Sequence, residues 1–229
     1  MMAIIGGTGL ADLADLSDTR RRVVRTPYGD PSCALTFGRI GGTDIVFLAR
    51  HGYGHTIAPH QINYRANIWA LREVGAERIV AVATVGGIRQ AFGPGQIIIP
   101  DQIIDYTHGR PSTFFEGPDA AVTHVDFTEP YDPGLRRMLL DSAACAGITV
   151  HDGGCYGCKS HYYHDYADPG PAFSFEPADS FGPCLAVRAA DQVLGIPLFT
   201  LPALSGLCQS HASSRKISAC CATILQSSP

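Results

Sequence analysis

The segment Ala3-Ile4-Ile5-Gly6-Gly7-Thr8-Gly9, close to the N-terminus, joins a short apolar run to a loop that contains three glycines. A short apolar run that ends in glycines is typical of a buried strand followed by a tight turn. The backbone N–H groups of such a turn, together with the hydroxyl of Thr8, can bind an anion. The loop lacks the later glycine of a dinucleotide-binding fingerprint and the lysine of a P-loop, so neither of those sites is predicted.

The same arrangement occurs twice more along the chain. Asp44–Ala49 is a predicted buried strand that leads into Arg50-His51, and Arg78–Ala83 is another that leads into Thr84-Val85-Gly86-Gly87. Ligands of open α/β sheets bind outside the carboxyl ends of the strands. A glycine-rich strand end is by itself more often a tight turn, because glycine adopts positive φ at no steric cost. Three loops with hydroxyl, guanidinium and imidazole donors together indicate an oxyanion site.

The remaining pattern predicts a single α/β domain with a mixed central β-sheet flanked by helices. The further elements expected are a helical turn over Leu10–Leu16, helices over Asn63–Val74 and Leu135–Ala146, and strands over Gln96–Pro100 and Gln102–Asp105. Gly75 is placed to end the first of the two long helices.

Composition excludes several classes of protein. The chain has 229 residues, of which 45% are hydrophobic and 17% charged, and its net charge is −4, so neither disorder nor a nucleic-acid-binding surface is predicted. The cluster Arg20, Arg21, Arg22 and Arg25 is expected to be a solvated face. No signal peptide and no apolar run of the roughly 20 residues that cross a membrane is found. We therefore expect a cytoplasmic protein with reduced cysteines.

A series of motifs between residues 3 and 158 carries a resemblance to a known family. In chain order they are Ile4-Ile5-Gly6-Gly7-Thr8-Gly9-Leu10, Thr26-Pro27-Tyr28-Gly29, Phe47-Leu48-Ala49-Arg50-His51-Gly52, Pro59-His60-Gln61-Ile62-Asn63-Tyr64-Arg65-Ala66-Asn67, Val85-Gly86-Gly87-Ile88-Arg89, Gly93-Pro94-Gly95, Asp101-Gln102-Ile103-Ile104-Asp105-Tyr106-Thr107 and His124-Val125-Asp126-Phe127. As an ordered set they resemble the purine nucleoside phosphorylases of the methylthioadenosine/methylthioinosine type. The resemblance implies the phosphorylase/hydrolase-like fold.

The resemblance also implies roles for individual residues. Thr8, Arg50, His51 and Thr84 match the family's phosphate-binding positions, and His124 matches a histidine that reaches the 5′ pocket of a neighbouring subunit in family trimers. A surface histidine that caps a turn is the other reading of His124. His60, Asn63 and Arg65 are interpreted as structural residues that hold the start of the helix after the phosphate loop.

The implied activity is phosphate-dependent cleavage of the N-glycosidic bond of a purine nucleoside, with a 5′-methylthio nucleoside favoured, in purine salvage. Positioning and electrostatics would supply the catalysis. Phosphate is then a co-substrate, no metal or organic cofactor is needed, and a homotrimer is expected. Val85-Gly86-Gly87 and His124-Val125-Asp126-Phe127 lean toward the methylthioinosine branch, while the choice between 6-oxo and 6-amino purines stays open.

The sequence changes character after Cys158. The first 158 residues contain no lysine and 4 serines, whereas the following 71 contain 2 lysines and 10 serines. Six of the eight cysteines lie from Cys155 onward. The family's ribose-binding and purine-protonating motifs are not found, so no residue is assigned to proton transfer. We expect residues 1–158 to be an incomplete nucleoside phosphorylase domain. Residues 159–229 are then an atypical, frame-shifted or otherwise substituted tail that does not continue the sheet.

Two alternatives remain. The first is a catalytically inactive member of the family that retains only phosphate or partner binding. The second is a zinc site at Cys155, Cys158, His161 and His164, which is disfavoured because the four ligands crowd into ten residues, whereas zinc sites draw on two separated pairs.

Overall fold

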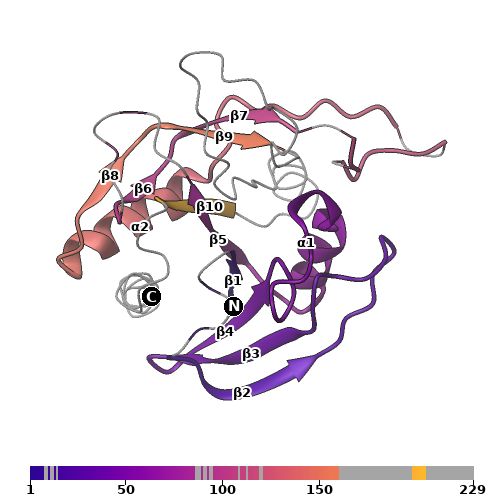
Figure 1. Cartoon of the computed structure of the whole chain (residues 1–229), viewed down its shortest axis with the longest axis horizontal. Coiled ribbons are helices and arrows are strands. Elements are labelled where there is room, and N and C mark those ends of the chain that lie inside the picture. Colours follow the sequence, from indigo (N-terminus) through magenta and orange to yellow (C-terminus); the bar gives the residue numbers. More distant parts are fainter. Residues whose placement is uncertain are drawn as a thin grey trace, which may run out of the picture.

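The computed structural model of the chain describes residues 1–7, 10, 13, 15–85, 89, 92, 95–107, 109–111, 113–118, 121–159 and 198–204. Within these residues the centre is a mixed eight-stranded sheet of order β2-β3-β4-β1-β5-β10-β6-β8 (Figure 1). Its strands are β1 (Met2–Gly6), β2 (Ser17–Arg22), β3 (Leu35–Ile40), β4 (Thr43–Ala49), β5 (Arg78–Val85), β6 (Ile97–Ile99), β8 (Val150–Asp152) and β10 (Leu198–Leu204). The predicted α/β fold with a mixed sheet is confirmed.

The middle of the sheet is the parallel trio β4-β1-β5, with β1 between the other two. Alternate residues of β1 point to opposite faces, as the two-residue period of a strand requires. Ala3 and Ile5 belong to one apolar cluster and Ile4 to another, and all three are at most 3% exposed. Because both faces are buried, these strands are continuous apolar runs, and this is why they could be predicted.

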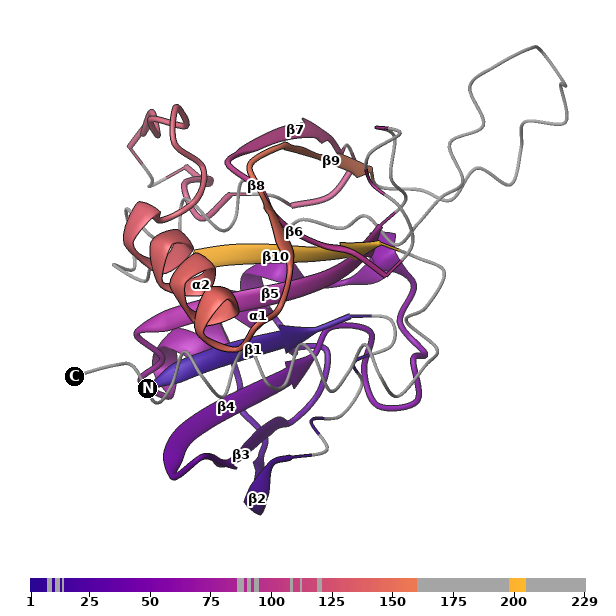
Figure 2. The same ribbon diagram turned by 90° about the vertical axis from the view of Figure 1, so that its left-hand side faces the viewer.

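Helices cover both faces of the sheet. Ile68 and Leu71 of α1 (Tyr64–Glu73) pack in the cluster that contains Ala3 and Ile5. Leu135 and Leu139 of α2 (Pro133–Cys145) pack in the cluster that contains Ile4. Figure 2 shows α2 on the opposite side of the sheet from α1. A short 3₁₀ turn, Pro59–Gln61, precedes α1. Neither helix in the described part of the chain has the length and apolarity needed to cross a membrane.

Asn63 sets the start of α1 and ties it to a distant loop. Its side-chain oxygen accepts a hydrogen bond from the backbone N–H of Ala66 at 3.1 Å, which satisfies one of the unpaired donors at the helix N-terminus. Its amide nitrogen donates to the carbonyl of Tyr28 at 2.6 Å. At the other end of α1, Gly75 has φ +85° and donates to the carbonyl of Arg72, as predicted for a C-terminal glycine.

A two-stranded parallel ribbon leaves the main sheet next to β6 and β8. It consists of β7 (Gln102–Tyr106) and β9 (Cys155–Lys159), and it lies above β10 in Figure 1. The chain turns from β8 into β9 at Gly153 and Gly154, whose φ values of +88° and +121° disfavour any other residue. The ribbon directs the segment after β7 back toward α1.

The structure adds elements that the sequence did not predict. The short strands β2, β3 and β8 were not predicted, and β2 is exposed along its whole length, as expected for the Arg20–Arg22 cluster. The expectation that the tail does not continue the sheet is wrong at one segment, because β10 pairs with β5 in parallel from Leu198↔Ile79 to Leu204↔Val85. Strands pair through backbone hydrogen bonds. A short apolar segment can therefore pair with β5 even when its sequence does not resemble that of the family. Residues 11, 12 and 14 of the predicted helical turn lie outside the described residues.

Replacing Asn63 by alanine should lower the free energy of unfolding by about 0.5–2 kcal/mol, because the helix cap is lost. Urea unfolding followed by circular dichroism measures the effect. Asn63→Asp is the matched control, since it keeps the capping oxygen and loses only the donor to Tyr28, and it should cost less. Equal stability of the alanine variant and the unaltered protein would contradict this role.

Candidate active site

The site begins where β1 and β4 end side by side. The parallel register pairs Gly6 with Ala49, so Gly7 and Arg50 follow next to each other at the carboxyl edge of the sheet. The backbone N–H of Arg50 donates to the carbonyl of Gly6 at 2.9 Å. A Cβ atom built on Gly7 would lie 2.1 Å from Nη2 of Arg50, a distance that no real contact allows. Gly7 is therefore required for the guanidinium to approach the backbone.

Arg50 is a charged side chain that is almost entirely removed from water. It is 1% exposed and is the largest fully buried side chain among the described residues. Its Nη1 donates to the carbonyl of Val82 in β5 at 3.3 Å. Within the described residues, Nε and Nη2 are buried and have no hydrogen-bond partner. A buried guanidinium with unused donors is costly unless an anion binds it, so the geometry indicates an anion site.

His51 lies next to Arg50 and is 2% exposed. Ile57 fixes it, because the backbone N–H of Ile57 donates to the carbonyl of His51 at 2.9 Å and ring Nδ1 lies 2.9 Å from the carbonyl oxygen of Ile57. A carbonyl oxygen only accepts, so Nδ1 carries a proton. In the neutral ring Nε2 is then an acceptor, and it donates only in the imidazolium form. The ring also lies 4.3 Å from the ring of His55.

Tyr64, the first residue of α1, lies beside these groups. Burial raises the pKa of its hydroxyl above the usual value, and the nearby positive charges of Arg50 and Arg110 oppose that rise. The hydroxyl lies 3.4 Å from the carbonyl of Pro59, to which it donates. At neutral pH Tyr64 is therefore a neutral group in a positively charged surrounding. Sequence analysis did not select Tyr64 or Arg110, because nothing in their local pattern places them at a strand end.

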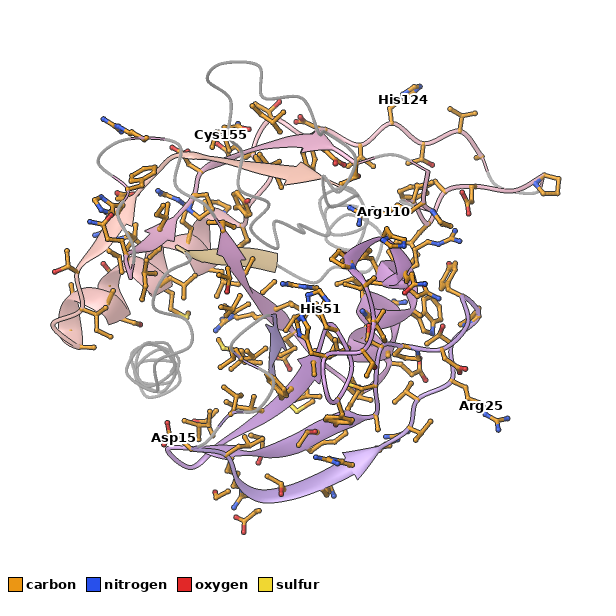
Figure 3. All side chains as sticks on the ribbon, in the orientation of Figure 1. Asp15, Arg25, His51, Arg110, His124 and Cys155 are labelled. Atoms are coloured by element: carbon orange, nitrogen blue, oxygen red, sulfur yellow. The ribbon has the colours of Figure 1, made fainter. Side chains whose placement is uncertain are left out.

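Of the other residues predicted to bind phosphate or substrate, Thr84 lies with Arg50 and His51, Thr8 is not described, and His124 lies elsewhere. Thr84 is 6% exposed near the end of β5, two residues after the carbonyl that Arg50 contacts, so Arg50, His51 and Thr84 come together at one edge of the sheet. Thr8 lies outside the described residues. His124 is exposed on an irregular segment of the same chain, and Figure 3 shows it well apart from His51.

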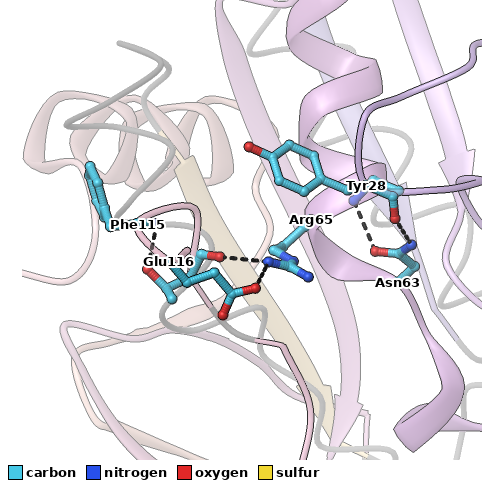
Figure 4. A network of polar contacts seen from close by, with 7 residues as sticks. Tyr28, Asn63, Arg65, Phe115 and Glu116 are labelled. Atoms are coloured by element: carbon cyan, nitrogen blue, oxygen red, sulfur yellow. Dashed lines mark hydrogen bonds and ion pairs between the residues drawn. The ribbon is translucent and has the colours of Figure 1, made fainter. Parts of the chain in front are cut away.

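The structural interpretation of Asn63 and Arg65 agrees with their contacts. Asn63 caps α1, and Arg65 donates to the carbonyl of Thr113 at 3.1 Å and forms an ion pair with Glu116 (Figure 4). His60 is exposed at the 3₁₀ turn. No group of three or more metal-ligating side chains occurs in the described part of the chain. The His161 and His164 ligands of the alternative zinc site lie outside that part.

Comparison with known proteins assigns the family. The profile of the phosphorylase superfamily matches residues 2–179, more than half of the chain. The chain belongs to the phosphorylase superfamily. The match extends past Cys158, where the resemblance in sequence was expected to end.

Curated relatives narrow the kinship within the superfamily. The chain is 50% identical over 156 residues to a probable S-methyl-5′-thioinosine phosphorylase of Xanthomonas campestris, covering 68% of this chain and 62% of the relative. It is 47% identical over 162 residues to the 6-oxopurine nucleoside phosphorylase of Pyrococcus furiosus, covering 69% and 60%. It is 45% identical over 157 residues to the S-methyl-5′-thioadenosine phosphorylase of Saccharolobus solfataricus, covering 69% and 57%. The methylthioadenosine/methylthioinosine subfamily is thus confirmed, and the chain spans about three fifths of the length of these relatives.

Solved structures agree on the fold. A methylthioadenosine phosphorylase from an antarctic soil metagenomic library matches with a TM-score of 0.80 and 29% identity, over 98% of this chain and 85% of that one. The ligand-free methylthioadenosine phosphorylase of Schistosoma mansoni matches with a TM-score of 0.82 and 25% identity, over 98% and 90%.

Replacing Arg50 by methionine should raise the free energy of unfolding in phosphate-free buffer, by up to about 4 kcal/mol, because an unpaired buried charge is replaced by an apolar chain of similar length. The same variant should lose the stabilisation that added phosphate gives to the unaltered protein. Denaturant unfolding with and without phosphate measures both effects.

Arg25→Met is the matched control, because Arg25 is exposed and points away from the site in Figure 3. It should leave the response to phosphate unchanged. If the Arg50 variant is stabilised by phosphate as much as the Arg25 variant, Arg50 is not an anion ligand.

Proposed function

We propose that this chain carries the phosphate-binding part of a purine nucleoside phosphorylase. One observation carries the proposal: a buried guanidinium at the carboxyl edge of the sheet of a phosphorylase-superfamily domain, with donors that have no partner among the described residues. Arg50, His51, Thr84 and Thr8 would hold inorganic phosphate below C1′ of the ribose. Positive charge there binds the nucleophile and places it beside a developing oxocarbenium ion.

The proposed reaction is phosphorolysis. A phosphate oxygen forms a bond to C1′ as the bond from C1′ to the purine nitrogen breaks, and the purine leaves with the bonding electron pair and takes up a proton. The products are a free purine base and a ribose 1-phosphate. A 5′-methylthio nucleoside of the 6-oxo series is the substrate that we favour, because the relatives of 50% and 47% identity are named for thioinosine and 6-oxopurine nucleosides. No metal or organic cofactor takes part in this scheme, and purine salvage in the cytoplasm is its setting.

The alternative is a chain that binds phosphate without turnover, and it is less favoured because the curated relatives are named as phosphorylases. We propose further that residues 159–229 replace a family-type continuation. The basis is the change in lysine, serine and cysteine content after Cys158. Grafting a family-type segment after Cys158 should then increase turnover.

Methylthioinosine should release hypoxanthine only when phosphate or arsenate is present, because water is not the proposed nucleophile. Xanthine-oxidase-coupled absorbance measures the release, with the Arg50→Met variant as a control that should be inactive. Equal release in phosphate-free buffer would identify a hydrolase. Phosphate binding without any turnover, in both the unaltered and the grafted chain, would support the non-catalytic alternative.

We propose that the assembly is a homotrimer in which His124 reaches a neighbour's 5′ pocket. The exposure of His124 in the single chain supports this, because the side chain is available to a second copy. Sedimentation at micromolar concentration should give the trimer mass. His124→Ala should keep that mass and raise KM for the nucleoside about threefold to tenfold, the worth of one hydrogen bond. A monomer, or an unchanged KM, would remove His124 from the site.

A further inference from the structure

Arg110 is a second guanidinium whose hydrogen bonds are not all used. Its central carbon lies 4.5 Å from the centre of the Tyr64 ring, in a cation–π contact. Its Nη1 is buried and has no hydrogen-bond partner among the described residues. Figure 3 shows Arg110 above α1, on the side of the helix where the ribbon's segment returns. The side chain is therefore held at the start of α1, with one donor that no described residue uses.

The segment that carries Arg110 is anchored to α1 and to the loop before it. Arg65 of α1 donates to the carbonyl of Thr113 at 3.1 Å and pairs with Glu116 (Figure 4). The ring of Phe114 packs edge-on against Tyr28, with 5.1 Å between ring centres. These contacts fix the backbone only three residues after Arg110. The contacts of Arg65 and Tyr28 with this segment thus determine where the guanidinium of Arg110 lies.

Arg110 and Arg50 both lie close enough to Tyr64 for their charges to act on it. Tyr64 lies under the guanidinium of Arg110, and the charges of both arginines act on its hydroxyl. Tyr64 also begins α1, whose N-terminal end carries a partial positive charge. In the part of the chain that the structure describes, neither arginine forms an ion pair with a carboxylate. Like charges gathered in this way repel each other unless an anion lies between them.

We propose that Arg110 is a second cationic ligand of the anion bound at Arg50, so that two guanidinium groups from different elements hold a doubly charged oxyanion. This inference rests on the phosphate-dependent function proposed above. Arg50 approaches the anion from the end of β4, and Arg110 approaches it from the segment after β7. Tyr64 supports the plane of Arg110 through its ring. Hydrogen phosphate has the charge that both groups would neutralise and the oxygens that both could contact.

Calorimetric titration of the full chain with inorganic phosphate tests the inference without requiring turnover. Arg110→Gln should weaken phosphate binding about tenfold or more, as expected for loss of a charge-assisted hydrogen bond. Arg110→Lys should recover part of the affinity, because it restores the charge but not the planar stacking on Tyr64. Arg72→Gln is the control. It removes an exposed charge from α1, the helix that carries Tyr64, and should change the affinity for phosphate less than about twofold, because exposed charges are screened.

Thermal unfolding of each variant without phosphate separates folding from binding. If Arg110→Gln does not fold, the comparison is made with Arg110→Lys, which should bind phosphate more weakly than the unaltered protein. In active protein the Arg110 variants should raise KM for phosphate more than KM for the nucleoside, a split that a general loss of structure would not give.

Three outcomes are distinguishable. Weaker phosphate binding by Arg110→Gln, with partial recovery in Arg110→Lys, supports the inference. Unaltered affinity in the Arg110 variants, together with loss of binding in Arg50→Met, overturns it while the proposed function stands. Absence of phosphate binding in the unaltered protein overturns the proposed function, and this inference with it.

Discussion

The burial of the Arg50 guanidinium is the constraint on which the rest of the site depends. Removing a charge from water costs several kcal/mol. Among the described residues the guanidinium has one hydrogen bond, to the carbonyl of Val82, which does not offset that cost. The parallel strands β4, β1 and β5 end around the guanidinium and keep it buried. The domain therefore gives up stability to keep a positive charge at the edge of its sheet, and an anion would restore what is lost. Stability and anion binding are opposed at this one residue.

Close packing explains Gly6 and Gly7 of the first loop, and it corrects the interpretation of both. Their conformational freedom was the reason expected from the sequence, but neither Gly6 nor Gly7 has a positive φ. Space is the reason instead. A Cβ on Gly6 would lie 2.0 Å from the carbonyl oxygen of Leu10 and 2.7 Å from the Phe47 ring, and one on Gly7 would collide with Arg50. The glycines are required by what packs against them.

Strands and site residues could be predicted from the sequence where a short local pattern marks them. The strands β1, β4 and β5 are continuous apolar runs, so Arg50, His51 and Thr84 could be selected as the residues next to or at their ends. The strands β2 and β3 lack such a run, and β10 lies in a segment whose composition gave no reason to expect it in the sheet. Tyr64 and Arg110 meet only through the path of the ribbon, which no local pattern records.

The outer strand β2 has a consequence for how copies of the domain behave toward one another. A strand at the border of a sheet offers unpaired backbone groups to any other strand. All six residues of β2 are exposed, and three of them are the consecutive arginines Arg20, Arg21 and Arg22. Two β2 edge strands side by side would bring six guanidinium groups together. Their repulsion disfavours edge-to-edge pairing of the sheets of two copies. Arg20, Arg21 and Arg22, which lie outside the site, thus disfavour aggregation through the β2 edge.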